Sequence, residues 1–307
     1  MRRRRRLRDL KDVPVLPSLV TLGNLFFGFL AIAKVADALR ETAPGAQFSA
    51  VVNLFETAAI LVFVAMVFDA LDGRIARMTG QSTPFGAQLD SMADMVTFGV
   101  APAVLGKVLV DFHAQSDANT LLPKHPKLYY VAAAIYVLCA ALRLARFNVE
   151  TGPADEDHSE FRGLPSPAAA SVVCALVVFF CTRDNPGEVV GHWLLARQHF
   201  DWIVVTMPLV LVTLGLLMVS RVPYPHAISV IVKRRHSFPF LAGLVVLIGI
   251  AAVEWEFALV VVTLGYVLWG LLLGSYRLLT RGRADEGGDD PDAGDDEPGE
   301  RSDPLLN

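Results

Sequence analysis

Long apolar stretches separated by short polar segments run through most of the chain. A helix needs about 20 apolar residues to cross the ~30 Å hydrocarbon core of a bilayer. Windows of this length predict eight transmembrane helices, near residues 18–38, 48–71, 87–110, 127–147, 165–182, 200–220, 237–253 and 256–275. The pattern therefore predicts an all-α, polytopic integral membrane protein.

The composition supports this fold class. Hydrophobic residues make up 53% of the 307 positions and charged residues only 19%, and the mean hydropathy is +0.46. Ordinary soluble domains are less apolar and more highly charged. The three cysteines all lie in predicted helices, so the sequence offers no disulfide framework and no cysteine-based metal motif.

Clusters of Lys and Arg predict the orientation, because such residues accumulate in short cytoplasmic loops. Basic residues gather before the first predicted helix, before the seventh and after the eighth. Eight crossings place these three clusters on one side of the membrane. We therefore expect both termini, and the turn between the second and third helices, on the cytoplasmic side of the inner membrane.

The two ends of the chain differ from its middle. Residues 1–14 form a basic juxtamembrane segment, 15–283 form one membrane domain, and 284–307 form an acidic tail with ten Asp or Glu residues. Such a tail cannot bury a core, so we predict that it is disordered. Without the tail the formal charge changes from −4 to +5, which suits a protein that handles anionic lipids and nucleotides.

Four aspartates flank the turn between the second and third predicted helices. Asp69 and Asp72 are three residues apart and Asp90 and Asp94 are four apart, so each pair lies on one face of its helix. Unneutralised charges at membrane depth would each cost at least ~3 kcal/mol. Oxygen ligands favour Mg²⁺ or Mn²⁺ over zinc. We expect the two faces to meet and to hold a divalent metal.

The residues around these aspartates complete a longer motif, Asp-x2-Asp-Gly-x2-Ala-Arg-x8-Gly-x3-Asp-x3-Asp, over residues 69–94. It resembles the signature of the CDP-alcohol phosphotransferase family at all eight fixed positions. The resemblance implies an enzyme in which a hydroxyl group displaces CMP from a CDP-linked lipid or alcohol, with two divalent ions bound. It assigns Asp69, Asp72, Asp90 and Asp94 to the metals and Asp90 and Asp94 to catalysis, with Asp94 as the general base. It assigns Asp69, Asp72, Gly73, Ala76, Arg77 and Gly86 to the nucleotide and diphosphate.

Elementary chemistry is consistent with these implied roles. Paired cations would orient a diphosphate and stabilise charge on the leaving CMP. Gly73 and Gly86 leave space where a ligand approaches the backbone, and Arg77 can donate two hydrogen bonds to a phosphate. No Ser/His/Asp or Cys/His arrangement indicates a covalent intermediate. We therefore expect direct in-line attack at the β-phosphorus.

Four further segments, at residues 22–24, 98–102, 141–148 and 161–170, resemble the phosphatidylserine synthase branch of this family. That resemblance implies CDP-diacylglycerol as the donor and L-serine as the acceptor. Arg143 and Arg146 can bind the carboxylate of serine, and Asn148 can orient the amino acid. Alternatively, both arginines extend to lipid phosphates or anchor the topology.

Polar residues near these segments allow two interpretations. Thr21 and Asn24 can reach the nucleotide or the diphosphate, or they can form hydrogen bonds between helices. Ser166 stands between Pro165 and Pro167, where free backbone N–H groups can face an anion or the prolines can simply make a rigid helix start.

Other functions remain open. The same site can act on another acceptor, such as glycerol phosphate or inositol phosphate. A divalent-metal or solute transporter would also place aspartates within the membrane, but it would not explain Arg77 or Gly86. The family resemblance leads us to expect a homodimer, with the lipid bilayer as its setting and no nucleic-acid partner.

Overall fold

The computed structural model describes residues 15–41, 48–79, 83–116, 126–150, 163–184, 201–222, 224, 242–243, 245–246, 248–249 and 254–286. Every regular element in these ranges is a helix. The elements are α2 (Val15–Glu41), α3 (Phe48–Thr79), α4 (Pro84–Asp94), the π-helix η1 (Met95–Val100), α5 (Ala101–Ser116), α6 (Pro126–Glu150), α7 (Ser166–Asp184), α8 (Asp201–Val219) and α11 (Trp255–Glu286).

The all-α membrane fold predicted from the sequence is confirmed. Among the described residues, six helices are long and apolar enough to cross a membrane, and α4, η1 and α5 together form one of them. A shorter apolar helix, Ser166–Thr182, matches the fifth predicted crossing. Only six residues of the predicted crossing at 237–253 are described, and residues 1–14 and 287–307 lie wholly outside the described residues. The proposed division into domains stays a prediction.

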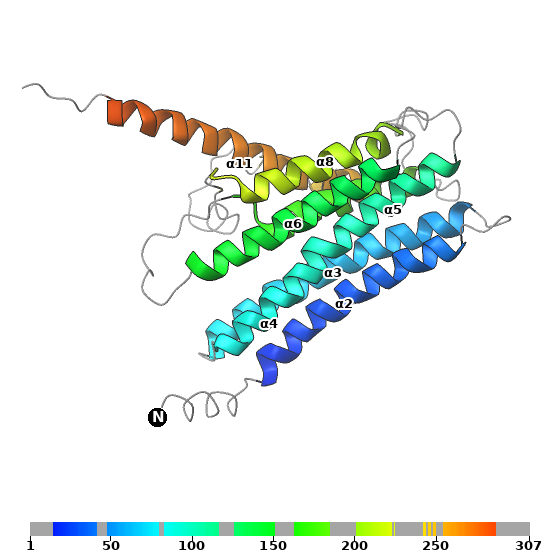
Figure 1. Cartoon of the computed structure of the whole chain (residues 1–307), viewed down its shortest axis with the longest axis horizontal. Coiled ribbons are helices and arrows are strands. Elements are labelled where there is room, and N and C mark those ends of the chain that lie inside the picture. The colour runs from blue at the N-terminus through cyan, green and yellow to red at the C-terminus, as the bar shows by residue number, and fades with distance from the viewer. Residues whose placement is uncertain are drawn as a thin grey trace, which may run out of the picture.

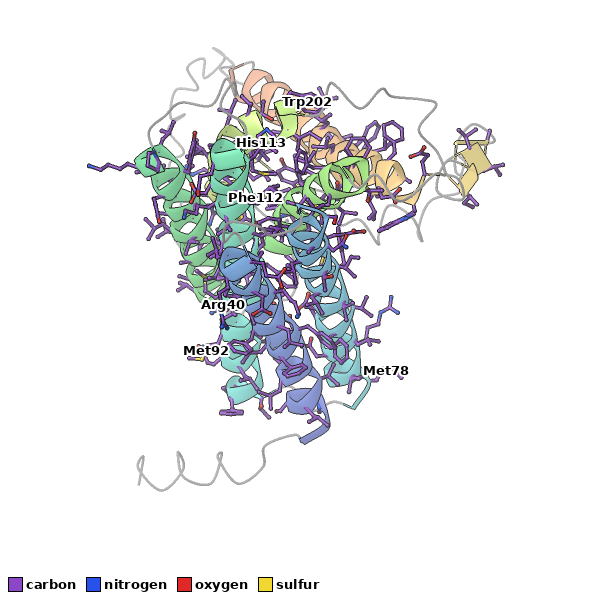
Figure 2. All side chains as sticks on the ribbon, turned by 90° about the vertical axis from the view of Figure 1, so that its right-hand side faces the viewer. Arg40, Met78, Met92, Phe112, His113 and Trp202 are labelled. Atoms are coloured by element: carbon purple, nitrogen blue, oxygen red, sulfur yellow. The ribbon has the colours of Figure 1, made fainter. Side chains whose placement is uncertain are left out.

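The helices form an elongated bundle. Figure 1 shows α2, α3, α5, α6 and α8 side by side with roughly parallel axes, while the C-terminal end of α11 extends beyond them. Helix α2 packs along α3, α6 packs on α8, and both α3 and α11 contact α7. Met78 and Met92 mark one end of the bundle, and His113 and Trp202 lie toward the other (Figure 2). The end marked by Met78 and Met92 contains the aspartates.

Helix α7 is the most enclosed element of the bundle. All ten residues from 172 to 181 are buried, because α3, α5, α8 and α11 contact this helix from several directions. A helix that is apolar on every side is expected in such a place. Helix α7 therefore lies at the centre of the packing.

The segment that leads into α7 is fixed to the end of α8. The N–H groups of Gly163 and Leu164 donate to the carbonyl oxygens of Val222 and Leu217, at 2.9 and 3.0 Å. Gly163 has a φ of 91°, a conformation that only glycine adopts readily. A Cβ atom there would also collide with the carbonyl oxygen of Met218. These contacts determine where Ser166, the first residue of α7, enters the bundle.

Candidate active site

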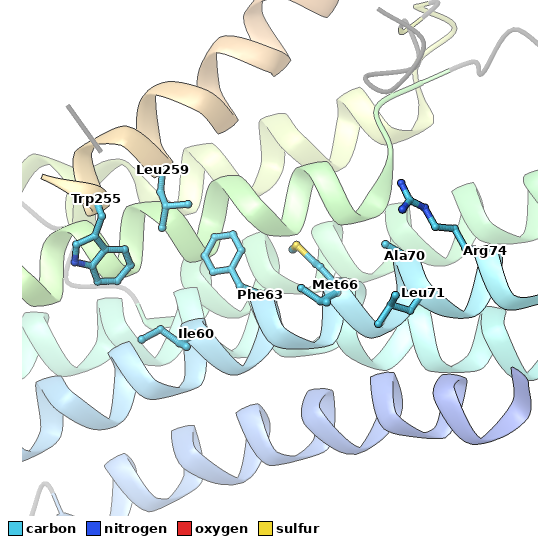
Figure 3. Close-up of a pocket in the computed structure, with 9 residues that line it drawn as sticks. Ile60, Phe63, Met66, Ala70, Leu71, Arg74, Trp255 and Leu259 are labelled. Carbon is cyan, nitrogen blue, oxygen red and sulfur yellow. The ribbon is translucent and has the colours of Figure 1, made fainter. Parts of the chain in front are cut away.

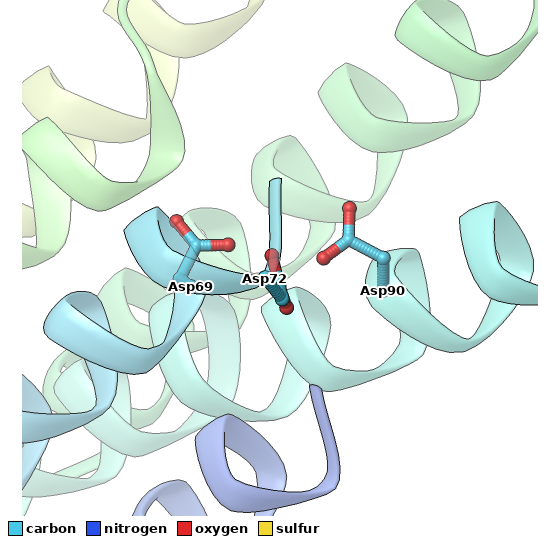
Figure 4. Close-up of side chains that lie close together, drawn as sticks. All are labelled: Asp69, Asp72 and Asp90. Carbon is cyan, nitrogen blue, oxygen red and sulfur yellow. The ribbon is translucent and has the colours of Figure 1, made fainter. Parts of the chain in front are cut away.

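Three of the four aspartates meet at one end of the bundle. Asp69 and Asp72 come from α3 and Asp90 from α4, and one carboxylate oxygen of each lies within 4.8 Å of the others. Figure 4 shows the three side chains converging. The two helix faces therefore meet as the spacing of the residues predicts.

Two carboxylate oxygen atoms of the cluster, on Asp72 and Asp90, have no hydrogen-bond donor among the described residues. Asp72 is only 6% exposed. Within the described part of the chain, Asp72 Oδ2, Asp90 Oδ1 and Asn24 Oδ1 are buried without a hydrogen-bond partner. A buried acceptor left in this state costs about 1–3 kcal/mol, and a charged one costs more. A hard divalent cation between Asp69, Asp72 and Asp90 would satisfy carboxylate oxygen atoms of this kind, so this donor set fits Mg²⁺ or Mn²⁺.

Asp94 lies beside the cluster of Asp69, Asp72 and Asp90. Its Oδ1 accepts a hydrogen bond of 3.3 Å from Asn24 Nδ2 on α2, and its carboxyl group interacts with that of Asp69. The cluster that could hold a metal is formed by the other three aspartates. Asp94 is thus placed next to the cluster, and its own binding to a metal stays a prediction.

The remaining motif residues occupy the ends of the same two helices. Thr83 caps α4 and Pro84 follows at its first turn, where the missing N–H is harmless. The backbone N–H of Gly86 donates to Thr83 Oγ1 at 3.1 Å. Gly73, Ala76 and Arg77 belong to α3. For Ala76 and Arg77 the structure describes the helical backbone but not the side chains. Their predicted contacts with the nucleotide remain predictions.

Helix α6 brings the predicted acceptor residues to the same end of the bundle. Arg143 Nη1 donates to Ser166 Oγ at 2.8 Å, and Asp94 lies close enough to act electrostatically on the guanidinium group. Asn148 Oδ1 accepts from the hydroxyl group of Ser91, at 3.1 Å. Arg146 is half-buried on the same helix. Arg143 and Asn148 therefore lie near the aspartates.

Two contacts in this region were not predicted from the sequence. Ser91 directly follows Asp90, yet its partner Asn148 is 57 residues away. Ser166 was interpreted as part of a helix start, whereas its side chain is buried and holds Arg143. The polar serine between two prolines was the available signal for this second contact. Asn24 forms a hydrogen bond between helices, as one of its two interpretations predicts, because its side chain on α2 donates to Asp94 of α4. Its contact with the nucleotide or the diphosphate stays a prediction.

An apolar groove of about 680 Å³ runs along α3 and reaches α11 (Figure 3). Eight of its nine lining residues are Ala or larger apolar side chains, and the ninth is Arg74. The lining residues are Ile60, Phe63, Met66, Val67, Ala70, Leu71, Arg74, Trp255 and Leu259. Arg74 lies at the end of the groove on the stretch of α3 that also carries Asp69 and Asp72.

Comparison with known proteins identifies the class to which this fold and site belong. Residues 14–213 match the CDP-alcohol phosphatidyltransferase family, and this match includes all eight motif positions. The chain belongs to this family of membrane-embedded transferases.

Individual relatives are similar over most of their length. A CDP-diacylglycerol–serine O-phosphatidyltransferase of Helicobacter pylori (strain ATCC 700392 / 26695) is 31% identical over 210 residues, 68% of this chain and 71% of that protein. A protein of the same name from Mycobacterium leprae is 31% identical over 278 residues, 89% of this chain and 76% of the relative. An archaetidylserine synthase of Methanothermobacter thermautotrophicus is 30% identical over 214 residues, 69% of this chain and 70% of that protein.

The unpartnered carboxylate oxygens lead to a prediction about metal binding. Asp72→Asn or Asp90→Asn should weaken Mn²⁺ binding more than about tenfold, because each removes a charged ligand and keeps the shape of the side chain. Electron paramagnetic resonance of free Mn²⁺, titrated with purified protein, measures this change. Asp37→Asn, on α2 and paired with Lys34, is the matched control and should bind Mn²⁺ normally. Equal binding by all the variants would exclude the cluster as the metal site.

Proposed function

We propose that the chain transfers the phosphatidyl group of CDP-diacylglycerol to the hydroxyl group of L-serine and releases CMP. The observation that carries this proposal is the convergence of the carboxylate cluster with Arg143 of α6 at one end of the bundle. Membership of the family supports the donor chemistry. The names of the relatives support serine as the acceptor.

The donor would bind through its diphosphate and nucleotide. Asp69, Asp72, Asp90 and Asp94 are the proposed ligands of two Mg²⁺ or Mn²⁺ ions, which would neutralise the diphosphate and stabilise charge on the departing CMP. The nucleotide would lie against Gly73, Ala76, Arg77 and Gly86. The fork of Arg77 suits a phosphate oxygen.

The two acyl chains of the donor must remain in an apolar environment. The groove beside α3 offers one of them a continuous apolar surface, and Arg74 at its end offers a cation to the phosphate. Asp69 and Asp72 belong to the same stretch of α3, but by helical spacing they lie on a different face of the helix from Ala70, Leu71 and Arg74. A lipid chain in the groove would therefore lie beside the helix that carries these aspartates, and its diphosphate would have to reach around the helix to meet them.

The acceptor would enter from the side of α6. Serine carries a carboxylate, which requires a strong donor such as the guanidinium group of Arg143 or Arg146. The Ser166 hydroxyl holds Arg143 in place, so less side-chain entropy is lost when serine binds. Asn148, bonded to Ser91, would orient the amino acid near Asp90 and Asp94.

Asp94 would act as the general base. It removes the proton of the serine hydroxyl while that oxygen attacks the β-phosphorus. A new bond forms between the serine oxygen and phosphorus, and the bond from phosphorus to the CMP oxygen breaks. Asn24 would hold Asp94 in the required orientation through their hydrogen bond.

The cytoplasmic location of the site and the homodimer are also proposals. The start of α2, the end of α3 and the start of α4 all lie at the end of the bundle that carries the aspartates (Figure 1). If the basic N-terminal segment is cytoplasmic, the site opens to the compartment that supplies nucleotides and metal ions.

The release of CMP by detergent-purified protein tests the proposed function. With CDP-diacylglycerol and Mn²⁺ or Mg²⁺, we expect release that requires L-serine and stops with EDTA. A folded Asp94→Asn variant should release no CMP above background. Release with glycerol 3-phosphate or inositol phosphate in place of serine would agree with the aspartate mechanism but would contradict serine as the acceptor. No release by folded protein under any condition would contradict the proposed transferase activity.

The role of Arg143 can be tested by comparing how a substitution changes the KM for serine and the KM for CDP-diacylglycerol. Arg143→Lys keeps the positive charge but removes the planar fork. We expect the KM for serine to rise about tenfold or more, while the KM for CDP-diacylglycerol changes less than about twofold. Arg40→Lys, at the exposed end of α2, is the matched control. Equal increases for both substrates would assign Arg143 to lipid binding or to structure.

A further inference from the structure

The π-helix η1 begins directly after Asp94. It covers Met95–Val100, and at its end the N–H of Ala101 donates to the carbonyl oxygen of Val96, five residues back. Short π-helical turns inside α-helices are rare and occur often at functional sites. Such a turn adds a residue to the helical repeat, so it changes how the face of α4 is rotated relative to the face of α5.

The sequence after η1 removes a backbone donor that the helix would otherwise supply. In a regular α-helix the carbonyl oxygen of Phe98 accepts from the N–H of residue 102. Residue 102 is proline, which has no N–H. The hydroxyl group of Tyr136 on α6 donates to this carbonyl oxygen at 3.1 Å. Tyr136 and Phe98 are both fully buried, so water does not replace this bond easily.

A second contact fixes the same turn from the opposite side. The hydroxyl group of Thr97 donates to the carbonyl oxygen of Asn24 on α2, at 3.3 Å. Helix α2 approaches this closely because Gly28 faces Thr97, and a Cβ atom on Gly28 would collide with the threonine hydroxyl. The side chain of the same Asn24 donates to Asp94. The π-turn and the candidate base are therefore held by one residue of α2.

We propose that Tyr136 is a positioning residue for the aspartate site. By bonding the Phe98 carbonyl, whose regular α-helical donor is missing because residue 102 is proline, Tyr136 maintains the π-turn. The turn sets the rotation of α4, and with it the direction in which Asp90 and Asp94 face α3. The inference rests on the metal site of the proposed function, but it concerns a residue of α6 outside the family motif.

The test measures Mn²⁺ binding directly and does not depend on turnover. Tyr136→Phe removes only the hydroxyl group. We expect Mn²⁺ binding to weaken about tenfold, because substitutions of residues that orient metal ligands commonly lower metal affinity by this amount. Tyr130→Phe, on the exposed face of the same helix, is the matched control and should bind Mn²⁺ normally. If Tyr136→Phe does not fold, Thr97→Val removes the opposite contact and carries the same expectation.

A double variant distinguishes a loss of the hydrogen bond to the Phe98 carbonyl from a general loss of packing around Tyr136. Pro102→Ala restores a backbone N–H that can donate to the Phe98 carbonyl. Tyr136→Phe combined with Pro102→Ala should therefore recover most of the Mn²⁺ affinity. Normal binding by folded Tyr136→Phe, or weakened binding without recovery in the double variant, would overturn the proposal. Absence of Mn²⁺ binding by the unsubstituted protein would instead overturn the metal site itself.

Discussion

The negative charge gathered at Asp69, Asp72 and Asp90 is the constraint on which the rest of the structure depends. Three carboxylates whose oxygen atoms lie within 4.8 Å repel one another, and partly buried charges of one sign are unstable without a counter-ion. The surrounding helices nevertheless hold them together, because α2 packs along α3 and also contacts α4 and η1. The bundle thus maintains an arrangement that a bound divalent cation would stabilise.

The enclosed helix α7 fixes the position of Arg143, the proposed acceptor-binding residue. Gly163 and Leu164 are bonded to the end of α8, and the buried Ser166 that follows them binds Arg143. The position of the guanidinium group therefore depends on contacts among α6, α7 and α8. The aspartates depend on α2, α3 and α4. The proposed donor and acceptor sides are therefore built from different helices that meet at one end of the bundle.

Much of the fold and part of the site could be predicted from the sequence. Apolar windows located the helices because a membrane crossing needs about 20 residues. Helical periodicity placed Asp69 with Asp72 and Asp90 with Asp94 on one face each. The meeting of the two faces was an expectation from their charge, and the structure joins three of the four aspartates. The π-turn at Met95–Val100 was not predicted, because local residue patterns do not distinguish it from an α-helix. The bonds of Arg143 to Ser166 and of Asn148 to Ser91 join separate helices, so no spacing within one helix reveals them.

The location of a bound ion tests the central claim most directly. Crystals of the protein grown with Mn²⁺ and CDP-diacylglycerol can be measured at a wavelength where manganese scatters anomalously. The account predicts a strong anomalous peak between the carboxylates of Asp69, Asp72 and Asp90, within about 2.0–2.6 Å of their oxygen atoms, the range for hard divalent cations. An anomalous peak at another place, with the CDP-lipid bound and no peak between these three carboxylates, would contradict the account.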